Sequence, residues 1–163
     1  MKLTGLKQSL LAPEPAALET VLLRVEALAA ETVDARAIIA VPMTCAERRR
    51  VRRRLIAADG QELGLALPTG TVLEPGSVLH ISPTKAYVVE AAPEEVVVIQ
   101  IDSWGDAARV AHAIGNLHRD IDPQPDGLLA LWDPPLELLL LRLGAAFERD
   151  RRPFLGRPSW EHP

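Results

Sequence analysis

The sequence of 163 residues is poor in cysteine and in aromatic residues. Its single cysteine, Cys45, cannot form an internal disulfide or a zinc site built from several thiols, and nothing near it in the sequence predicts an activating base, so we expect a structural role. Aromatic residues make up 4% of the chain, so leucine, valine, isoleucine and alanine must fill the core. Such sparse cysteine usage favours a reducing compartment, and we expect the cytoplasm.

Long apolar runs and an excess of basic residues are also absent. No apolar run approaches the ~20 residues that a membrane-spanning helix needs. The N-terminal segment is too broken by Pro13, Glu14 and Pro15 to form a signal-peptide core. The formal net charge of -4 gives no general attraction to the phosphates of nucleic acid. We therefore expect neither a membrane nor a nucleic acid as partner.

The motifs of several large enzyme classes are missing as well. The sequence contains no P-loop, no G-x-G-x-x-G after a strand, and no defensible Ser-His-Asp arrangement. The sequence therefore predicts a protein that is not an enzyme.

Residues 19–92 have the pattern of short β-strands separated by turns. Asp59-Gly60 lies between two strand candidates and is a dipeptide that tolerates the positive φ of a two-residue hairpin turn. Strands at this spacing without intervening helices indicate a small sandwich or barrel-like domain. Residues 1–18 show little pattern, so we expect a loosely ordered extension before this domain.

After Pro93 the pattern changes to strand, helix, strand, strand, helix, strand. The run "EVVVIQI" predicts a buried strand, and Ser103 is a helix N-cap. Gly115 can end that helix in the left-handed conformation. The next strand candidates are "LHRDID" and "GLLALW", which flank a proline-containing loop.

The second half of this region has its own start and stop signals. Asp133 followed by Pro134 predicts the start of a helix that runs to Gly144, and "AAFERD" can close the sheet. The order is that of a ferredoxin-like βαββαβ domain, which we place at residues 93–150. The predicted fold class is thus α+β, with the all-β domain first and a flexible tail at residues 151–163.

Two helical surfaces in this region favour self-association. The segment "PLELLLLRL" is apolar almost all round, more than so small a domain can bury. We expect it to form a two-fold interface together with the exposed side of the helix at 104–114.

The arginine-rich stretch at residues 47–55 has two interpretations. It indicates a solvated surface, or a docking surface for an acidic protein partner. Nucleic-acid binding is the alternative, but aromatic residues for base stacking are absent nearby.

His118 is the main candidate for a metal ligand. It follows the expected helix end, where a lone histidine is often only a favourable cation. If "HRDID" is a strand, His118, Asp120 and Asp122 point to one face and combine an imidazole with two carboxylates. His112 lies opposite the buried face of its helix, and His162 lies near the C-terminus.

Three stretches in the order expected for one family carry a resemblance. They are "RRRLIAADGQELGLALPTGTVLEPGSVL", "VVEAAPEEVVVI" and "ARVAHAIGNLH". Across residues 20–150 the chain resembles the urease accessory protein E family, the nickel metallochaperones of urease maturation. The resemblance implies a homodimer with a partner-docking β-domain and a metal-binding ferredoxin-like domain. It also implies Ni(II) as cargo, Zn(II) or Cu(II) binding in vitro, and other urease accessory proteins and apo-urease as partners.

The same resemblance assigns the ligands. The histidine of the "GN-x-H" element is the central nickel ligand, and it corresponds to His118 from both subunits. Many family members carry a further His-x-His pair where this chain has Trp132-Asp133-Pro134, and a histidine-rich tail where it ends in "PSWEHP". His162 is therefore the remaining tail candidate, and His112 is a further candidate.

One histidine per chain can suffice because a two-fold axis doubles it. Nickel favours imidazole, but one imidazole among waters binds weakly, whereas two facing copies of His118 form a two-imidazole site. The leading prediction is a nickel-delivering chaperone for urease. The alternatives are a protein-interaction adaptor of the same fold that has lost efficient metal handling and, more remotely, an RNA-binding β-domain.

Overall fold

The computed structural model describes residues 22–30, 33, 36–125 and 127–156. The N-terminal extension assigned to residues 1–18 lies outside these residues, and so does His162.

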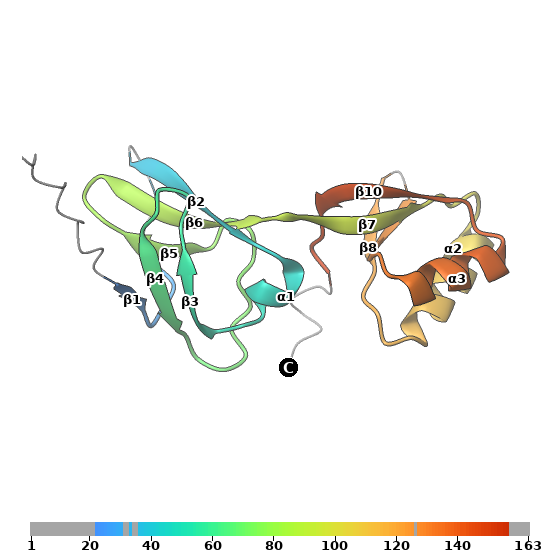
Figure 1. Ribbon diagram of the computed structural model, residues 1–163, viewed down its shortest axis with the longest axis horizontal. Helices are drawn as coiled ribbons and strands as arrows, with labels where there is room; N and C mark the ends of the chain where they lie inside the picture. Colours follow the sequence, from blue (N-terminus) through green and yellow to red (C-terminus); the bar gives the residue numbers. More distant parts are fainter. Residues whose placement is uncertain (1–21, 31–32, 34–35, 126, 157–163) are drawn as a thin grey trace, which may run out of the picture.

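The first half of the chain forms two three-stranded sheets (Figure 1). Their strands are β1 (Leu23–Val25), β2 (Ala37–Met43), β3 (Arg52–Ile56), β4 (Glu62–Ala66), β5 (Val78–Ile81) and β6 (Lys85–Ala91). One sheet has the order β1-β4-β3 and the other β2-β6-β5. This arrangement confirms the predicted N-terminal β-domain.

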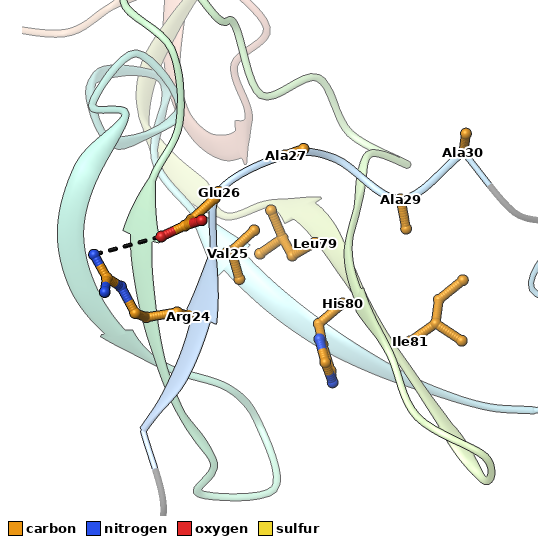
Figure 2. Close-up of a pocket in the computed structure, with 9 residues that line it drawn as sticks. All are labelled: Arg24, Val25, Glu26, Ala27, Ala29, Ala30, Leu79, His80 and Ile81. Atoms are coloured by element: carbon orange, nitrogen blue, oxygen red, sulfur yellow. Dashed lines mark ion pairs between the residues drawn. The ribbon is translucent and has the colours of Figure 1, made fainter.

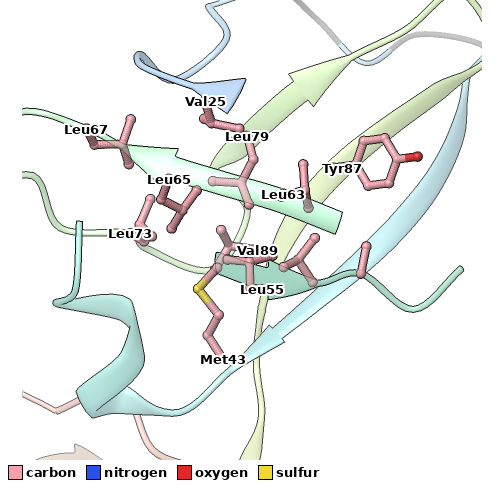
Figure 3. Close-up of a cluster of buried hydrophobic side chains, with 12 residues drawn as sticks. Val25, Met43, Leu55, Leu63, Leu65, Leu67, Leu73, Leu79, Tyr87 and Val89 are labelled. Carbon is pink, nitrogen blue, oxygen red and sulfur yellow. The ribbon is translucent and has the colours of Figure 1, made fainter. Parts of the chain in front are cut away.

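Alternation along the strands builds the core of this domain. In β4, Leu63 and Leu65 are buried, while Gly64 between them is only half-buried. Leu55 of β3 pairs directly with Leu63, so aliphatic side chains from neighbouring strands meet on the inner face. Figure 3 shows how leucines, valines and Met43 from both sheets converge on one cluster.

The turn between β3 and β4 forms where Asp59-Gly60 predicts it, but it is longer than predicted. The connection spans residues 57–61, and Gly60 adopts a φ of +85°, a conformation that favours glycine. The Ala58 N–H donates to the carbonyl of Ala40 in β2 at 3.0 Å. The longer connection thus lets the β3–β4 hairpin form a backbone hydrogen bond to the other sheet.

The second half is a four-stranded antiparallel sheet with two helices on one face (Figure 1). Its elements are β7 (Pro93–Ile99), α2 (Trp104–Gly115), β8 (Asp122–Gln124), β9 (Gly127–Leu131), α3 (Pro134–Leu143) and β10 (Phe147–Pro153). The strand order β10-β7-β9-β8 is that of a ferredoxin-like domain. The predicted fold class is confirmed.

Local signals set most helix ends as predicted. Ser103 caps α2 by accepting from the Asp106 N–H, and Asp133 caps α3 by accepting from the Leu136 N–H. Gly144 ends α3 at a φ of +65°. α2 ends at Gly115 as predicted, but the left-handed conformation expected there is wrong, because the left-handed residue is His118, with a φ of +55°.

The strand predicted at "LHRDID" is also wrong for most of its length. The chain continues from α2 as a turn through His118, whose N–H donates to the carbonyl of Gly115 at 2.8 Å. β8 begins only at Asp122 and contains Pro123. Proline is tolerated there because β8 is the edge strand of the sheet.

β7 is buried on both faces, as its unbroken apolar run predicts. Val97 and Ile99 pack beneath α2 and α3. Val96 and Val98 face the other way and pack with Cys45 and Phe154. This second cluster joins the two domains.

A short helix, α1 (Cys45–Arg48), lies at the junction between the domains (Figure 1). Its first N–H, that of Cys45, donates to the Glu94 carboxylate at 2.6 Å. β10 extends to Pro153, within the segment 151–163 that the sequence assigns to the tail, and Phe154 is buried. Over the described ranges, every helix is too short or too polar to cross a membrane.

Candidate metal centre

His118 lies on the surface at the turn that follows α2. Its side chain is exposed, and it is the one non-glycine residue with positive φ among the residues that the structure describes. Left-handed backbone costs a residue with a Cβ roughly 1–2 kcal/mol. Strain of this kind persists where the surrounding structure fixes it, and it is common at binding sites.

The residues after His118 are held on both sides of the loop. Arg119 forms an ion pair with Asp133, the N-cap of α3. Asp120 pairs with Arg49, 2.7 Å between Arg49 Nη2 and Asp120 Oδ2. The loop is thus tied to α3 at one residue and to the N-terminal domain at the next.

The expected row of one imidazole and two carboxylates is not formed, because these residues are not on a common strand. Asp120 faces Arg49, and Asp122 is buried and accepts from the Leu155 N–H at 3.2 Å. Both carboxylates are therefore engaged in contacts within the chain, and His118 is left as the exposed donor of the loop.

The other candidate histidines are His112 and His162. His112 is exposed on α2, with its Nε2 atom 3.1 Å from Nδ2 of Asn116 in the following turn. This contact occupies one ring nitrogen of His112. His162 lies outside the described residues, so its role stays a prediction.

One chain supplies few metal donors. Within the described part of the chain, no group of three or more His, Cys, Asp and Glu side chains is arranged to hold a metal ion. Nickel needs several donors and prefers imidazole nitrogen. A site at His118 therefore requires donors from a second chain, from the tail, or from a client.

The segment before α3 has a structural role. The Trp132 indole N–H donates to Glu137 at 2.7 Å, and Arg149 pairs with the same carboxylate while lying 4.0 Å over the indole ring. The hydrogen bond from Trp132, followed by that from Arg149, holds the pKa of Glu137 below its ordinary value. The polar groups of Trp132, Glu137 and Arg149 thus bind one another and stabilise the start of α3.

The N-terminal domain contains a pocket of about 260 Å³ that is a weaker metal candidate. It lies between β5 and residues 24–30, and Figure 2 shows His80 and Glu26 on its wall. Glu26 pairs with Arg24 at 3.4 Å, and the His80 ring lies 6.2 Å from that of Tyr87. One imidazole and one committed carboxylate make a poor metal site.

The arginine-rich stretch is only partly the solvated surface that the sequence predicts. Arg48 is buried, Arg49 pairs with Asp120, and Arg53 pairs with Glu47 at 2.9 Å. The arginines at positions 50, 52 and 54 are exposed. Three members of the run therefore hold the chain together, and the sequence gives no signal that separates them from the rest.

Cys45 has the environment of a structural residue, in agreement with the sequence. It is buried, its Sγ atom lies 3.6 Å from the carbonyl oxygen of Leu155, and burial raises the pKa of its thiol. A raised thiol pKa lowers the fraction of reactive thiolate.

Comparison with known proteins places the chain in one family. The family model described as "UreE urease accessory protein, N-terminal domain" matches residues 18–92, and the model of the corresponding C-terminal domain matches residues 94–161. The urease accessory protein UreE of Deinococcus radiodurans is 57% identical over 124 residues, 76% of this chain and 80% of the relative. That of Synechococcus sp. is 49% identical over 125 residues, 77% of this chain and 84% of the relative.

Proposed function

Because the chain belongs to the UreE family of urease accessory proteins, we propose that it is a homodimeric nickel carrier that delivers Ni(II) during assembly of the urease active site. Family membership gives the coarser part of this function, an accessory role in urease assembly rather than catalysis. The proposed partners are a second copy of the chain, the other urease accessory proteins and apo-urease, in the cytoplasm.

The backbone of His118 is the observation that carries the proposal. An exposed side chain gains little packing energy, yet His118 keeps a conformation that glycine would adopt without strain. A required imidazole accounts for a histidine at this position. The anchored residues that follow it, Arg119 and Asp120, hold the loop in one place.

The chemistry follows from doubling this imidazole. Two copies of His118 across a two-fold axis donate two nitrogen lone pairs to one ion, and His162 from the tail adds a further imidazole. Such a site leaves coordination positions for donors of the client, so the ion can be passed on. Zn(II) and Cu(II) also favour imidazole, and we expect them to compete with Ni(II) in vitro.

Titration of the intact protein with Ni(II) tests this function. The expected result is about one ion per dimer, with binding lost in His118→Ala because one change removes both imidazoles. His80→Ala is the matched control, since it removes a histidine from the N-terminal domain, and it is expected to bind nickel normally. Equal binding by His118→Ala and the intact protein would overturn the proposal.

The alternative is an interaction adaptor of the same fold that handles metal poorly. The specific observation in its favour is the corner at Trp132 and Asp133, where side chains hold α3 instead of offering further imidazoles. Weak and similar binding by the intact protein, His118→Ala and His80→Ala would favour the adaptor.

A further inference from the structure

The helix α1 of the N-terminal domain touches two separate segments of the C-terminal domain. One is the chain at residues 154–156, which leads from β10 into the tail, and the other is the loop that carries His118. These contacts come from Arg48, the last residue of α1, and from Arg49, the C-cap that follows it.

Arg48 holds the start of the tail. Its side chain is 4% exposed, and its Nη2 atom donates to the carbonyl oxygens of Phe154 at 2.5 Å and Leu155 at 3.2 Å. Hydrogen bonds from a buried charged donor to backbone carbonyls are expensive to lose. The tail therefore starts from a fixed point on α1.

Gly156 packs closely against Cys45 and Arg49. Its φ is +76°, and a Cβ atom there would lie 2.5 Å from Cys45 Sγ and 3.1 Å from Arg49 Nη2. The absence of a side chain at Gly156 thus lets the tail backbone pass directly beneath the Arg49 guanidinium.

Arg49 also contacts the loop that carries His118, through Asp120. The Arg49 and Asp120 side chains are 35% and 14% exposed, so their ion pair is partly shielded from water. Burial by itself would lower the pKa of Arg49, but the hydrogen bond and the attraction of Asp120 raise it. The pair therefore binds the two domains at a point two residues from His118.

We propose that Arg49 is a positioning residue for the metal site: by holding Asp120 it fixes the loop that presents His118, so that nickel affinity in the C-terminal domain depends on α1 of the N-terminal domain. This inference rests on the proposed function, since it takes His118 as the nickel ligand. Arg119, held by Asp133, provides the anchor on the side of α3. Displacement of α1 removes the other anchor and lowers the affinity.

Nickel titration of a double-mutant cycle tests the proposal. Arg49→Gln is expected to bind nickel about three- to tenfold more weakly than the intact protein at unchanged stoichiometry, the range for a partly shielded charged pair. Asp120→Asn should weaken binding similarly, and the double variant no further, because each single change already breaks the Arg49–Asp120 ion pair. Arg50→Gln is the matched control, since Arg50 is exposed, and it should bind normally.

A second readout separates positioning from general destabilisation. In the metal-free protein, the imidazole NMR signals of His118 are expected to shift in Arg49→Gln and to return toward their original positions in Arg49→Lys, which keeps the charge. Those of His80 are expected to stay unchanged in both.

The outcomes distinguish this inference from the proposed function. If His118→Ala abolishes nickel binding while Arg49→Gln binds like the intact protein, the positioning role is overturned and the proposed function stands. Additive effects of Arg49→Gln and Asp120→Asn would also overturn the positioning role. If His118→Ala binds nickel normally, both are overturned.

Discussion

At the scale of single residues, His118 combines exposure with backbone strain. A side chain on the surface contributes little to the core, so selection for stability alone would favour glycine at a φ of +55°. The position thus offers a direct comparison between what the fold prefers and what the proposed metal site needs.

Replacement of His118 by glycine is expected to raise the free energy of unfolding by up to about 1 kcal/mol, because glycine adopts this conformation without a Cβ clash. The same variant should lose nickel binding. Urea unfolding of the metal-free protein and nickel titration measure the two effects. A less stable glycine variant would mean that the imidazole itself holds the turn.

A comparison of Gly156 with Gly144 separates the cost of backbone strain from the cost of a packing clash. Both glycines have positive φ, so alanine is strained at either position. Gly156→Ala also brings its Cβ into a clash with Cys45 Sγ, whereas nothing lies within 4 Å of a Cβ at Gly144. Gly156→Ala is expected to lower the free energy of unfolding by about 1–3 kcal/mol more than Gly144→Ala does. Urea unfolding of both variants measures the difference. Equal losses of unfolding free energy would show that the structure around residue 156 can shift to accept a Cβ.

At the scale of elements, α1 depends on its cap and its tertiary contacts. A helix of four residues cannot form on its own. The Thr44 N–H donates to Glu47 at 2.9 Å, the Glu47 N–H donates to Thr44 Oγ1 at 3.2 Å, and Arg53 pairs with Glu47. The hydrogen bond from the Thr44 backbone is the main cause that lowers the pKa of Glu47.

This lowered pKa predicts a pH dependence with a definite sign. The ionised Glu47 is favoured in the folded protein, so its contribution to stability is complete above its ordinary pKa of 4.5 and is lost as the pH falls below that value. The difference in free energy of unfolding between the intact protein and Glu47→Gln should therefore shrink from pH 7 to about pH 3. Urea unfolding at several pH values measures it, and a constant difference would exclude a role for the charge.

Elements with strong local signals could be predicted from the sequence. β7 follows from its β-branched run, and both long helices follow from the caps Ser103 and Asp133. β8 could not be placed, because an edge position makes Pro123 acceptable within a strand. α1 was not predicted although Thr44 and Glu47 have the spacing of a capping box, because four residues are too few to show a helical period.

The candidate site also combines features that the sequence predicts with features that depend on the fold. A motif resemblance singled out His118, but local sequence placed the left-handed residue at Gly115 and both aspartates beside the imidazole. Arg49 and Asp120 are 71 positions apart, and no periodicity or spacing connects them. The partners of the loop therefore became visible only with the fold.

At the scale of the whole molecule, α2 and α3 leave apolar side chains in water. Trp104 is 92% exposed, Leu138 56% and Leu141 62%. These residues lie on the two helices that the sequence predicts at a two-fold interface. The homodimer stays a prediction, and these side chains give it a direct test.

The double substitution Leu138→Glu and Leu141→Glu is expected to give a monomer and, because the two copies of His118 then separate, to weaken nickel binding strongly. Ile56→Glu, at an exposed apolar residue of the N-terminal domain, is the control and should remain dimeric. Light scattering of the metal-free proteins at micromolar concentration measures the mass. A monomeric intact protein would rule out the two-fold site, and a dimeric double variant would place the interface elsewhere.

The passage from one domain to the other is a nearly continuous strand. Only Ala92 separates β6 from β7, and its N–H donates to the carbonyl of Met43 at 2.9 Å. Flexible linkers let two domains sample many separations, whereas a hydrogen-bonded strand permits few. The connection therefore restricts how the two domains can move apart. Under the proposed function, a client bound to the β-domain would meet His118 at one distance and from one direction, and a client of different dimensions would have to change its own conformation to receive the ion.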